Sequence, residues 1–493
     1  MNMNTLNNND VNILDPFYVR HLDLTVLSLL NDNSPVNNQI FDRIRTKILP
    51  QIHNRVTKLP IEPLSMKCIL NAIDYLVLTS LSLVNFQSET LFHHLTGDNI
   101  LLRLFTNQIT HLEVSICDKK RGAPGRNEVD IFSLMLSIGK CLTDLAFGLR
   151  WIDERIEFSF FDLPSTTCVS SSLTKLVITL HTFDDCLHLL DGRLKHLSML
   201  IIDIMKIRRT SPNIDNNKNL PELKCFSLRS HWYTCFYDNR IVPLLPRMLN
   251  LEELTLFLSV ITNESTYIDG TQLYNDFLIY MPQLSKFYFS MHTNIFNNDI
   301  DIDHPSNNDI LKSFIKRGYQ QVNSYADDQL TYKNWSCCHV YSLPYHFNDF
   351  LFMTSRFQGG MFNKVRCLVM DYARPFENEL FKIISQDFPF LESLPVVNRA
   401  SQKNKEHSST FITFSHLLRL DLAVVHTDYA VKFLFGKNTS LPRLMHLDIK
   451  FETLVTVTEG FTNDAARRTY TQIESLVIWE PFVCPENFFS YFS

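Results

Sequence analysis

Glycine is scarce in this chain, at 12 of 493 residues. That share is about 2.4%, against the ~7% that is usual in proteins. Loops that cradle phosphate groups need glycine where the backbone approaches the ligand closely. The sequence contains neither GxGxxG nor GxxxxGK[ST]. These absences argue against the common nucleotide-binding folds, and we expect no cofactor.

An excess of charge of either sign is also missing. The chain has 46 basic and 52 acidic residues, a formal net charge of −6. Such a balance gives no bulk attraction for nucleic acid or for an anionic membrane surface. The longest apolar run, 75–83, is interrupted by Thr79, Ser80 and Ser82 and is shorter than a membrane span. We therefore expect neither a nucleic acid nor a membrane as partner.

The cysteine pattern gives no framework of disulfides. The count is odd, at 11, and no CxxC occurs. The first twelve residues lack the basic and apolar regions of a secretory signal. Reduced thiols packed among apolar neighbours are typical of a reducing compartment. We expect an intracellular protein of the cytoplasm or nucleus.

Catalytic motifs are absent as well. The sequence has no HExxH and no GxSxG. The densest group of possible metal ligands is Asp299, Asp301, Asp303 and His304. This group lacks the glycine of an EF-hand loop and has isoleucine between the carboxylates, so an exposed acidic loop is favoured. We expect no enzyme, with a hydrolase or metal site in this segment kept as a remote alternative.

What the chain does contain is a repeated motif, apolar-x-x-Leu/Phe-x-apolar. A chain this apolar is expected to contain roughly a dozen chance matches to the motif. The inference therefore rests on the regular spacing of the matches. From Leu173 to Leu284, and again from Val365 to Ile473, the motif advances by about 27 to 28 residues per step. A period of ~20–29 residues with this core is the leucine-rich-repeat signature. The motifs begin at Val19, Val56, Leu78, Ile109, Leu142, Leu173, Leu194, Leu223, Leu251, Leu284, Val365, Leu391, Leu417, Leu444 and Ile473.

The motif predicts a short strand followed by a helical or irregular return. In LTKLVI, Leu176 and Ile178 point to one face, and Lys175, Val177 and Thr179 to the other. Stacked repeats bury these leucines together and form a parallel sheet. The fold class is therefore α/β, an irregular leucine-rich-repeat solenoid with a curved sheet on its concave side. Pro60 and Pro395 fall within expected strands and make those two repeats the weakest.

The concave side of such a solenoid is a binding surface for another protein. Its mixture of charges favours contacts with a protein over a simple charged ligand. The residues expected on this face are His111, Glu113, Lys175, Arg229, Glu253, Lys286, Tyr288, Arg419, Asp421, His446, Asp448 and Lys450. A solvated sheet face with no partner is the alternative interpretation.

Four segments follow from these patterns. Residues 1–18 form an Asn-rich N-terminus that is expected to be disordered, and 19–292 form the first part of the solenoid. Residues 293–338 interrupt the period and are expected as a polar insertion or as irregular repeats, and 339–493 form the second part. The polar stretch 398–409 is expected as an exposed loop.

Three stretches resemble the divergent leucine-rich-repeat proteins that often carry an N-terminal F-box. They are Ile268–Thr293, His339–Phe352, and the tail from LPRLMHLDIKF to RRTYTQIESLVIWEPFVCPENFFSYF. The resemblance implies recognition of a target for a ubiquitin ligase of the SCF type, with the F-box bound to the Skp-type adaptor of the cullin machinery. Only 18 residues precede the first repeat-like strand, so we expect the F-box to be missing, truncated or cryptic. The segment Leu59–Leu76 resembles only the opening of one.

Two functions are therefore expected as alternatives. The first is a substrate receptor of a ubiquitin ligase, and the second is a free-standing binding or scaffold protein of the same fold. In both, the partner is another protein and the chain is a monomer.

Overall fold

A computed structural model describes most of the chain after residue 43. The described residues are 44–97, 100–117, 126–149, 168–208, 218–262, 266–296, 305–319, 321–327, 335–403, 411–435, 438–463, 473–485, 488 and 491. The N-terminal segment 1–18, the first motif at Val19 and the acidic group Asp299 to His304 lie outside these residues. So does 404–410, which includes the second half of the expected polar loop.

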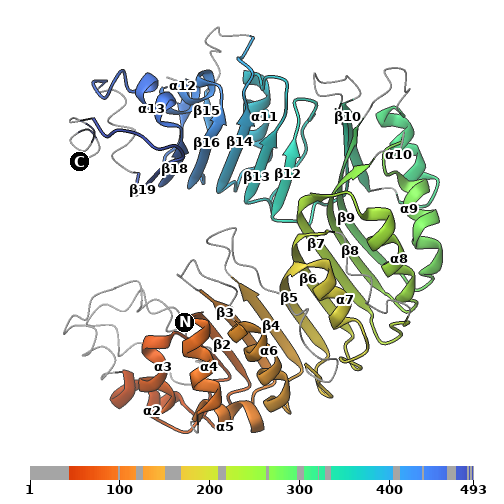
Figure 1. The fold of residues 1–493 in the computed structure, drawn as a ribbon, viewed down its shortest axis with the longest axis vertical. Helices are drawn as coiled ribbons and strands as arrows, with labels where there is room; N and C mark the ends of the chain where they lie inside the picture. Colours follow the sequence, from red (N-terminus) through yellow and green to blue (C-terminus); the bar gives the residue numbers. More distant parts are fainter. Residues whose placement is uncertain are drawn as a thin grey trace. The chain divides into compact units, whose positions relative to one another are not determined.

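The first sheet contains eleven strands in the order β1-β2-β3-β4-β5-β6-β7-β8-β9-β11-β10. The strands from β1 to β7 pair in parallel. In Figure 1 the strands β2 to β7 follow one another in chain order, with helices α4, α6 and α7 on one side of them. The bounds of the first nine strands are β1 Lys58–Ile61, β2 Ser80–Phe86, β3 His111–Ile116, β4 Asp144–Leu149, β5 Lys175–Thr182, β6 Met199–Lys206, β7 Cys225–Thr234, β8 Glu253–Thr262 and β9 Lys286–Phe296.

By its contacts the chain divides into two compact units. Unit 1 is Met1–Thr255 with Phe277–Phe287, and unit 2 is Leu256–Asp276 with Tyr288–Ser493. The returns of unit 1 are η5 Ile44–Ile48, α2 Leu49–Ile52, α3 Pro63–Leu70, α4 Ser88–Thr96, α5 Ile100–Asn107, α6 Arg126–Ile138, α7 Phe183–Leu189, η6 Tyr237–Ile241, α8 Val242–Leu244, η7 Leu245–Arg247 and η8 Leu278–Tyr280. Where the connections between strands are described, helices and irregular turns thus alternate with the strands, as the motif predicts.

One backbone carbonyl in each repeat holds the next strand in place. The carbonyl of Thr79 accepts from both N–H groups of Thr110 and His111, each at 3.0 Å. The carbonyl of Thr110 accepts in the same way from Thr143 and Asp144, at 2.9 and 3.0 Å. The acceptor is always the second residue of a motif, and the donors are the second and third residues of the following motif. This shared acceptor is the reason why each strand begins at the third residue.

A ladder of hydroxyl groups reinforces this arrangement in unit 1. The hydroxyl of Thr143 donates to the Thr110 carbonyl at 3.1 Å, and that of Thr174 donates to the Thr143 carbonyl at 3.0 Å. Ser198 donates to the Thr174 carbonyl at 3.1 Å. A short hydroxyl side chain at the second position is therefore a third donor to a carbonyl that already accepts from two N–H groups.

The hydroxyl ladder shows that one predicted repeat was placed at the wrong residues. The motif expected from Leu194 would begin its strand at His196, but β6 begins at Met199. The matching sequence is LSMLII from Leu197, with Ser198 in the hydroxyl ladder. The prediction was wrong by three residues because Leu194 and Leu197 both satisfy the loose pattern.

Alternate strand side chains form the core of unit 1. From Lys175 to His181 in β5 the side chains alternate between partly buried and buried. The fourth motif residues pair across neighbouring strands and are at most 3% exposed; they are Leu81, Leu112, Leu145, Leu176, Leu200 and Phe226. Burial of each leucine in such a row removes apolar surface from water and stabilises the unit by ~1.5–3 kcal/mol.

The prolines occupy positions that tolerate a missing N–H group. Pro60 lies in β1, the edge strand of its sheet. Pro395 lies in a central strand, β14, where the register shifts between Pro395 and Val397. Edges and irregularities are the places where a sheet accepts proline.

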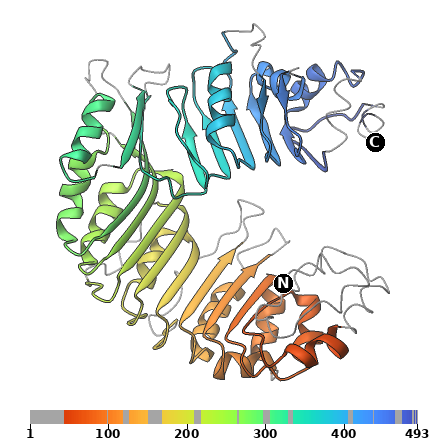
Figure 2. The ribbon, with the colours of Figure 1, turned by 180° about the vertical axis from the view of Figure 1, so that it is seen from behind.

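Unit 2 contains a second, parallel sheet in the order β12-β13-β14-β16-β18-β19. Figure 2 shows its strands, cyan to blue, again side by side in chain order. The bounds are β12 Asp349–Met353, β13 Cys367–Asp371, β14 Ser393–Asn398, β16 Arg419–Val425, β18 His446–Ile449 and β19 Ser475–Ile478, with the small pair β15 Ile412–Thr413 and β17 Thr439–Ser440. The helices are α9 Gly270–Asp276, α10 Asn307–Ile315, α11 Asn378–Asp387, α12 Thr427–Phe435 and α13 Phe451–Val457.

The segment 293–338 contributes regular structure as well as residues outside the described ranges. It holds the end of β9, helix α10, strand β10 Val322–Asp327 and the start of β11 Trp335–Ser342. Both β10 and β11 are antiparallel to their neighbours, and β11 pairs with β9. Helix α9 approaches α10 so closely that a Cβ atom at Gly270 would lie 2.7 Å from the Phe314 nitrogen. Gly270 is therefore required by this contact.

Aromatic side chains fill much of the core of unit 2. The rings of Phe362 and Phe388 stack with centroids 4.6 Å apart, and Phe350 lies edge-on to both. All three are at most 2% exposed. The high phenylalanine content thus serves packing in this unit, as we expected from the sequence.

Two histidines lie directly opposite each other inside unit 2. His292 of β9 pairs with His339 of β11, and they are 3% and 1% exposed. The His339 ring nitrogens lie 2.9 Å from the Ser290 hydroxyl and 3.2 Å from the Tyr325 hydroxyl. Burial lowers the pKa of His292 to about 3 and lowers that of His339 as well. Both rings are therefore neutral at physiological pH.

We predict that replacing a core residue lowers the free energy of unfolding more than replacing its outward neighbour does. Leu176→Ala should lower the free energy of unfolding by about 2–5 kcal/mol, because it leaves a cavity at a fully buried site. Val177→Ala, on the partly exposed face, should lower it by less than about 1 kcal/mol. Urea denaturation followed by circular dichroism measures both. Equal losses would contradict the alternation of faces.

We also predict that the buried histidines destabilise the protein in acid. Above pH ~6.5 both rings are neutral in the folded and unfolded states and contribute no pH dependence. As the pH falls below ~6.5, the unfolded chain binds protons that the folded chain rejects. The free energy of unfolding should then fall by up to about 1.4 kcal/mol per pH unit for each histidine.

Urea denaturation at pH 7 and pH 5 measures this loss. His292→Phe keeps a ring at the site and should reduce the loss, whereas His196→Phe, at an exposed position, should leave it unchanged. An identical loss in His292→Phe and in the unchanged protein would rule the mechanism out.

Candidate interaction surface

The third and fifth residues of the motifs line the sheet face opposite the leucine core, which we call the outward face. In unit 1 the third residues pair across the strands from Ser80 through His111, Asp144, Lys175 and Met199 to Cys225. The fifth residues form a parallel row, which is Ser82, Glu113, Ala146, Val177, Ile201 and Ser227. Two straight rows of side chains therefore cross β2 to β7.

The expected face residues of unit 1 lie on these rows or on their extension. His111 and Glu113 are exposed, and Glu113 accepts a hydrogen bond from the Ser82 hydroxyl at 3.1 Å. Lys175 forms an ion pair with Asp144 at 2.8 Å. Arg229 lies two residues further along β7 than Ser227 and pairs in register with Asp203. These side chains share one face, although mutual ion pairs already engage part of their charge.

Glu253 and Lys286 form a second pair, at 3.1 Å, on β8 and β9. Their side chains are 34% and 58% exposed, so solvent screens the attraction. This pair and the Asp144–Lys175 pair flank the strands β6 and β7 on both sides.

The centre of the outward face in unit 1 is apolar. Val177 pairs in register with Ile201, and Ala146 and Met199 lie beside them on the two rows. All four are partly exposed. We call them the apolar centre. Charged and polar side chains surround it, including Asp144, Lys175 and the ion pair of Asp203 with His231 at 3.0 Å.

Sequence reasoning missed Met199 and Ile201 because of the register error at Leu194. In the wrong register the outward residues would be His196 and Ser198, both polar. A signal for the correct register is present, since the second residue of the motifs from Val56, Leu78, Ile109, Leu142 and Leu173 is always threonine. Ser198 continues this hydroxyl series, and Lys195 does not.

In unit 2 the expected residues range from the exposed Arg419 to the buried Asp448. Arg419 donates to Asp448 from Nε and Nη2 at 3.0 and 2.9 Å, and Asp448 is only 2% exposed. Asp421 lies opposite Asp448 in register, and burial raises its pKa above the usual value. His446 is exposed, and Lys450 precedes helix α13. Asp448 is therefore a structural residue that orients Arg419.

Tyr288 has a packing role. Its ring lies 4.3 Å from that of His346, and it packs against the aromatic core of unit 2. It is half-buried, so only part of its ring is accessible.

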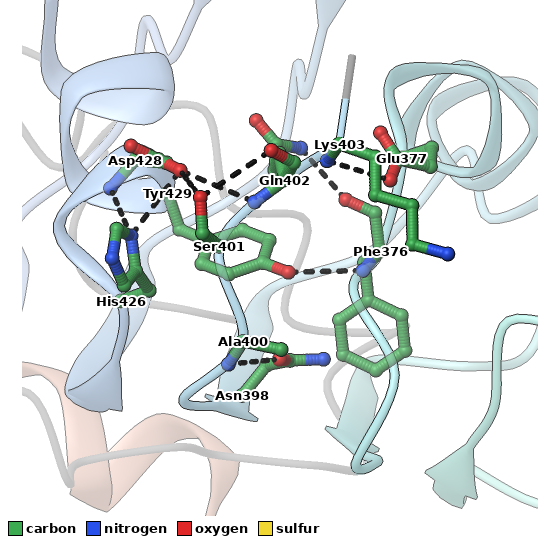
Figure 3. A network of polar contacts seen from close by, with 10 residues as sticks. All are labelled: Phe376, Glu377, Asn398, Ala400, Ser401, Gln402, Lys403, His426, Asp428 and Tyr429. Atoms are coloured by element: carbon green, nitrogen blue, oxygen red, sulfur yellow. Dashed lines mark hydrogen bonds and ion pairs between the residues drawn. The ribbon is translucent and has the colours of Figure 1, made fainter. Parts of the chain in front are cut away.

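A polar network connects the loop after β14 to two helices. Figure 3 shows Ser401 and Gln402 reaching Asp428 of α12, while Lys403 reaches Glu377 just before α11. The buried Gln402 amide donates to the Phe376 carbonyl at 2.7 Å. The first part of the expected exposed loop is thus bonded to its neighbours on both sides.

The same network brings together a serine, an aspartate and a histidine without forming a catalytic triad. The Ser401 hydroxyl donates to Asp428 Oδ2 at 2.7 Å, and His426 Nδ1 lies 3.2 Å from the same oxygen. In a triad the histidine lies between the serine and the carboxylate, so that it can take the serine proton. Here the carboxylate lies between them, which gives Ser401 no base.

Other possible sites can be assessed only within the described ranges. There, no three His, Cys, Asp or Glu side chains are grouped so as to hold a metal ion. The acidic group Asp299 to His304, to which the metal alternative refers, lies outside those ranges. In the described part of the chain, no helix has the length and apolar character needed to cross a membrane.

Comparison with protein-family models and with curated proteins finds no match to this chain. The fold and the residues of the outward face are therefore the basis for a function.

We predict a difference between the two kinds of ion pair. Asp448→Asn removes the buried negative charge that Arg419 faces and should lower the free energy of unfolding by about 1–3 kcal/mol. Glu253→Gln breaks a solvated pair and should lower it by at most about 1 kcal/mol. Denaturation curves of both variants test the assignment. A larger loss for Glu253→Gln would refute it.

Proposed function

We propose that the chain binds another protein through the outward face of unit 1. The observation that carries this proposal is the apolar centre of Ala146, Val177, Met199 and Ile201 within a polar and charged surround. Protein interfaces have this anatomy, with an apolar core that a partner buries and a polar rim. If no partner bound this face, polar side chains at these four positions would not reduce the stability of the fold.

We further propose that the stacked strands are leucine-rich repeats of an irregular solenoid. The common start of each strand at the third motif residue supports this, as does the shared carbonyl acceptor. In such proteins the sheet face, with its parallel rows of side chains, is the binding surface. The partner's contact surface should combine an apolar side chain with groups that complement Asp144, Lys175 and Glu113.

Target recognition for a ubiquitin ligase is the more specific form of this proposal. Its support is the resemblance to F-box leucine-rich-repeat proteins. Purified Skp-type adaptor mixed with the full chain tests it by size-exclusion chromatography. A stable complex supports the ligase role, whereas no complex favours the free-standing binding or scaffold protein.

We predict that the apolar centre controls partner capture. Ile201→Arg places a charge where the partner must bury an apolar group, and it should weaken capture by at least about tenfold. Val431→Arg changes an exposed residue of α12, 46% accessible, and serves as the control. Affinity capture from a cell extract with quantitative mass spectrometry measures both, after circular dichroism has shown that each variant is folded. Proteins retained equally by both variants would contradict the proposal.

A further inference from the structure

Unit 1 contains a cavity that is not part of the outward face. Its volume is about 230 Å³, and it lies between the turn that follows α7 and the segment that precedes β7. Six leucine side chains line it, namely Leu189, Leu190, Leu194, Leu197, Leu220 and Leu223. Five of these six are at most 7% exposed, so the apolar surface is recessed. The exposed residues Gly192, Lys195 and Glu222 lie at its mouth.

A buried arginine connects the two walls of the cavity through hydrogen bonds. Arg247 is 6% exposed and donates from Nη2 to the Leu190 carbonyl at 3.1 Å. Its Nε donates to the Lys218 carbonyl at 2.7 Å, and its own carbonyl accepts from the Leu220 N–H at 2.9 Å. These bonds connect Arg247 to both walls and fix their separation. The cavity is therefore a preformed feature of the backbone.

The lining gives water little to bind. A buried water molecule needs about two to four polar partners, and leucine side chains offer none. An apolar cavity of ~150 Å³ can stay dry and bind benzene, whereas sites for drug-sized ligands begin near 300 Å³. A volume between these limits suits a molecule of one or two small rings.

The charges around the cavity point to an uncharged ligand. The hydrogen bonds of Arg247 to backbone carbonyls already engage its guanidinium. Lys195 and Glu222 have opposite charges and are exposed at the mouth, so they give no net attraction for an ion. A charged group in the leucine-lined part would lose its hydration without a partner.

We propose that this cavity binds a small, uncharged, largely apolar molecule about the size of an aromatic bicycle. The recessed floor favours a small molecule over a side chain presented by a flat protein surface. The site lies apart from the apolar centre, so the proposal is independent of the function proposed for the outward face.

Indole is a probe of this size and chemistry. Isothermal titration of the full chain with indole should show one saturable site with a sub-millimolar dissociation constant. Leu220→Trp places an indole ring of the protein's own at the cavity wall and should weaken indole binding by at least about tenfold. Leu249→Trp changes a neighbouring residue that is 43% exposed and does not line the cavity, so it should bind indole as the unchanged protein does.

Circular dichroism and thermal unfolding establish that each variant is folded. If Leu220→Trp does not fold, Asn219→Trp, at an exposed lining position, takes its place with the same expected loss. Absence of saturable binding up to the solubility of indole would overturn the proposal. Equal affinities for the cavity variant and for Leu249→Trp would overturn it as well.

Discussion

The carbonyl group of the second motif residue is the constraint on which the rest of the structure depends. It accepts from two successive N–H groups of the next repeat, from Thr57 to Glu252 in the first sheet and from Asn348 to Met445 in the second. A buried backbone carbonyl that loses its donors costs free energy comparable to a lost hydrogen bond. Two donors on one acceptor leave only one register for each new strand. The register then decides which side chains enter the core, because a slip by one residue exchanges the two faces.

The outward face is a consequence of that register. Once Leu176 and Leu200 are fixed in the core, Val177 and Ile201 must lie side by side on the opposite face. Their apolar character is not required by the fold, since β3 and β7 carry Glu113 and Ser227 at the same position. A feature that folding does not need is the best available indication of a partner. The equivalent face of unit 2 instead uses its charges internally, as Arg419 and Asp448 do.

Much of the fold could be predicted from the sequence, because strand positions depend on local patterns. The motifs from Leu78, Ile109, Leu142 and Leu173 each begin a strand at their third residue. The pattern failed at Leu194 and Leu197 because both satisfy it, and it takes no account of the hydroxyl at the second position, which selects Leu197 through Ser198. The repeat FNDFLF from Phe347 was also missed, although it fits the motif with phenylalanine at the first, fourth and sixth positions, and β12 begins at its third residue, Asp349.

Contacts between residues that are far apart in the sequence could not be predicted from local patterns. The antiparallel strands β10 and β11 depend on pairing with β9, and no local period encodes that pairing. The twelve face residues were chosen by motif position, which gives the face but not the burial of each side chain. Asp448 is thus buried although its partner Arg419 is exposed, and Tyr288 packs on His346. The cavity beside Leu220 arises from two segments joined through Arg247, a contact that no motif indicates.

The most direct test of the account is a cross-link that reads the register of β6. Met199 pairs with Cys225 of β7, a native cysteine with a free thiol. Neighbouring strands lie ~4.8 Å apart, within the range of Cα separations that a disulfide bridges. Under mild oxidation Met199→Cys should therefore join positions 199 and 225, and peptide mapping by mass spectrometry would detect the linked peptides. His196→Cys should give no such link; a bond from position 196 to position 225, with none from 199, would contradict the account.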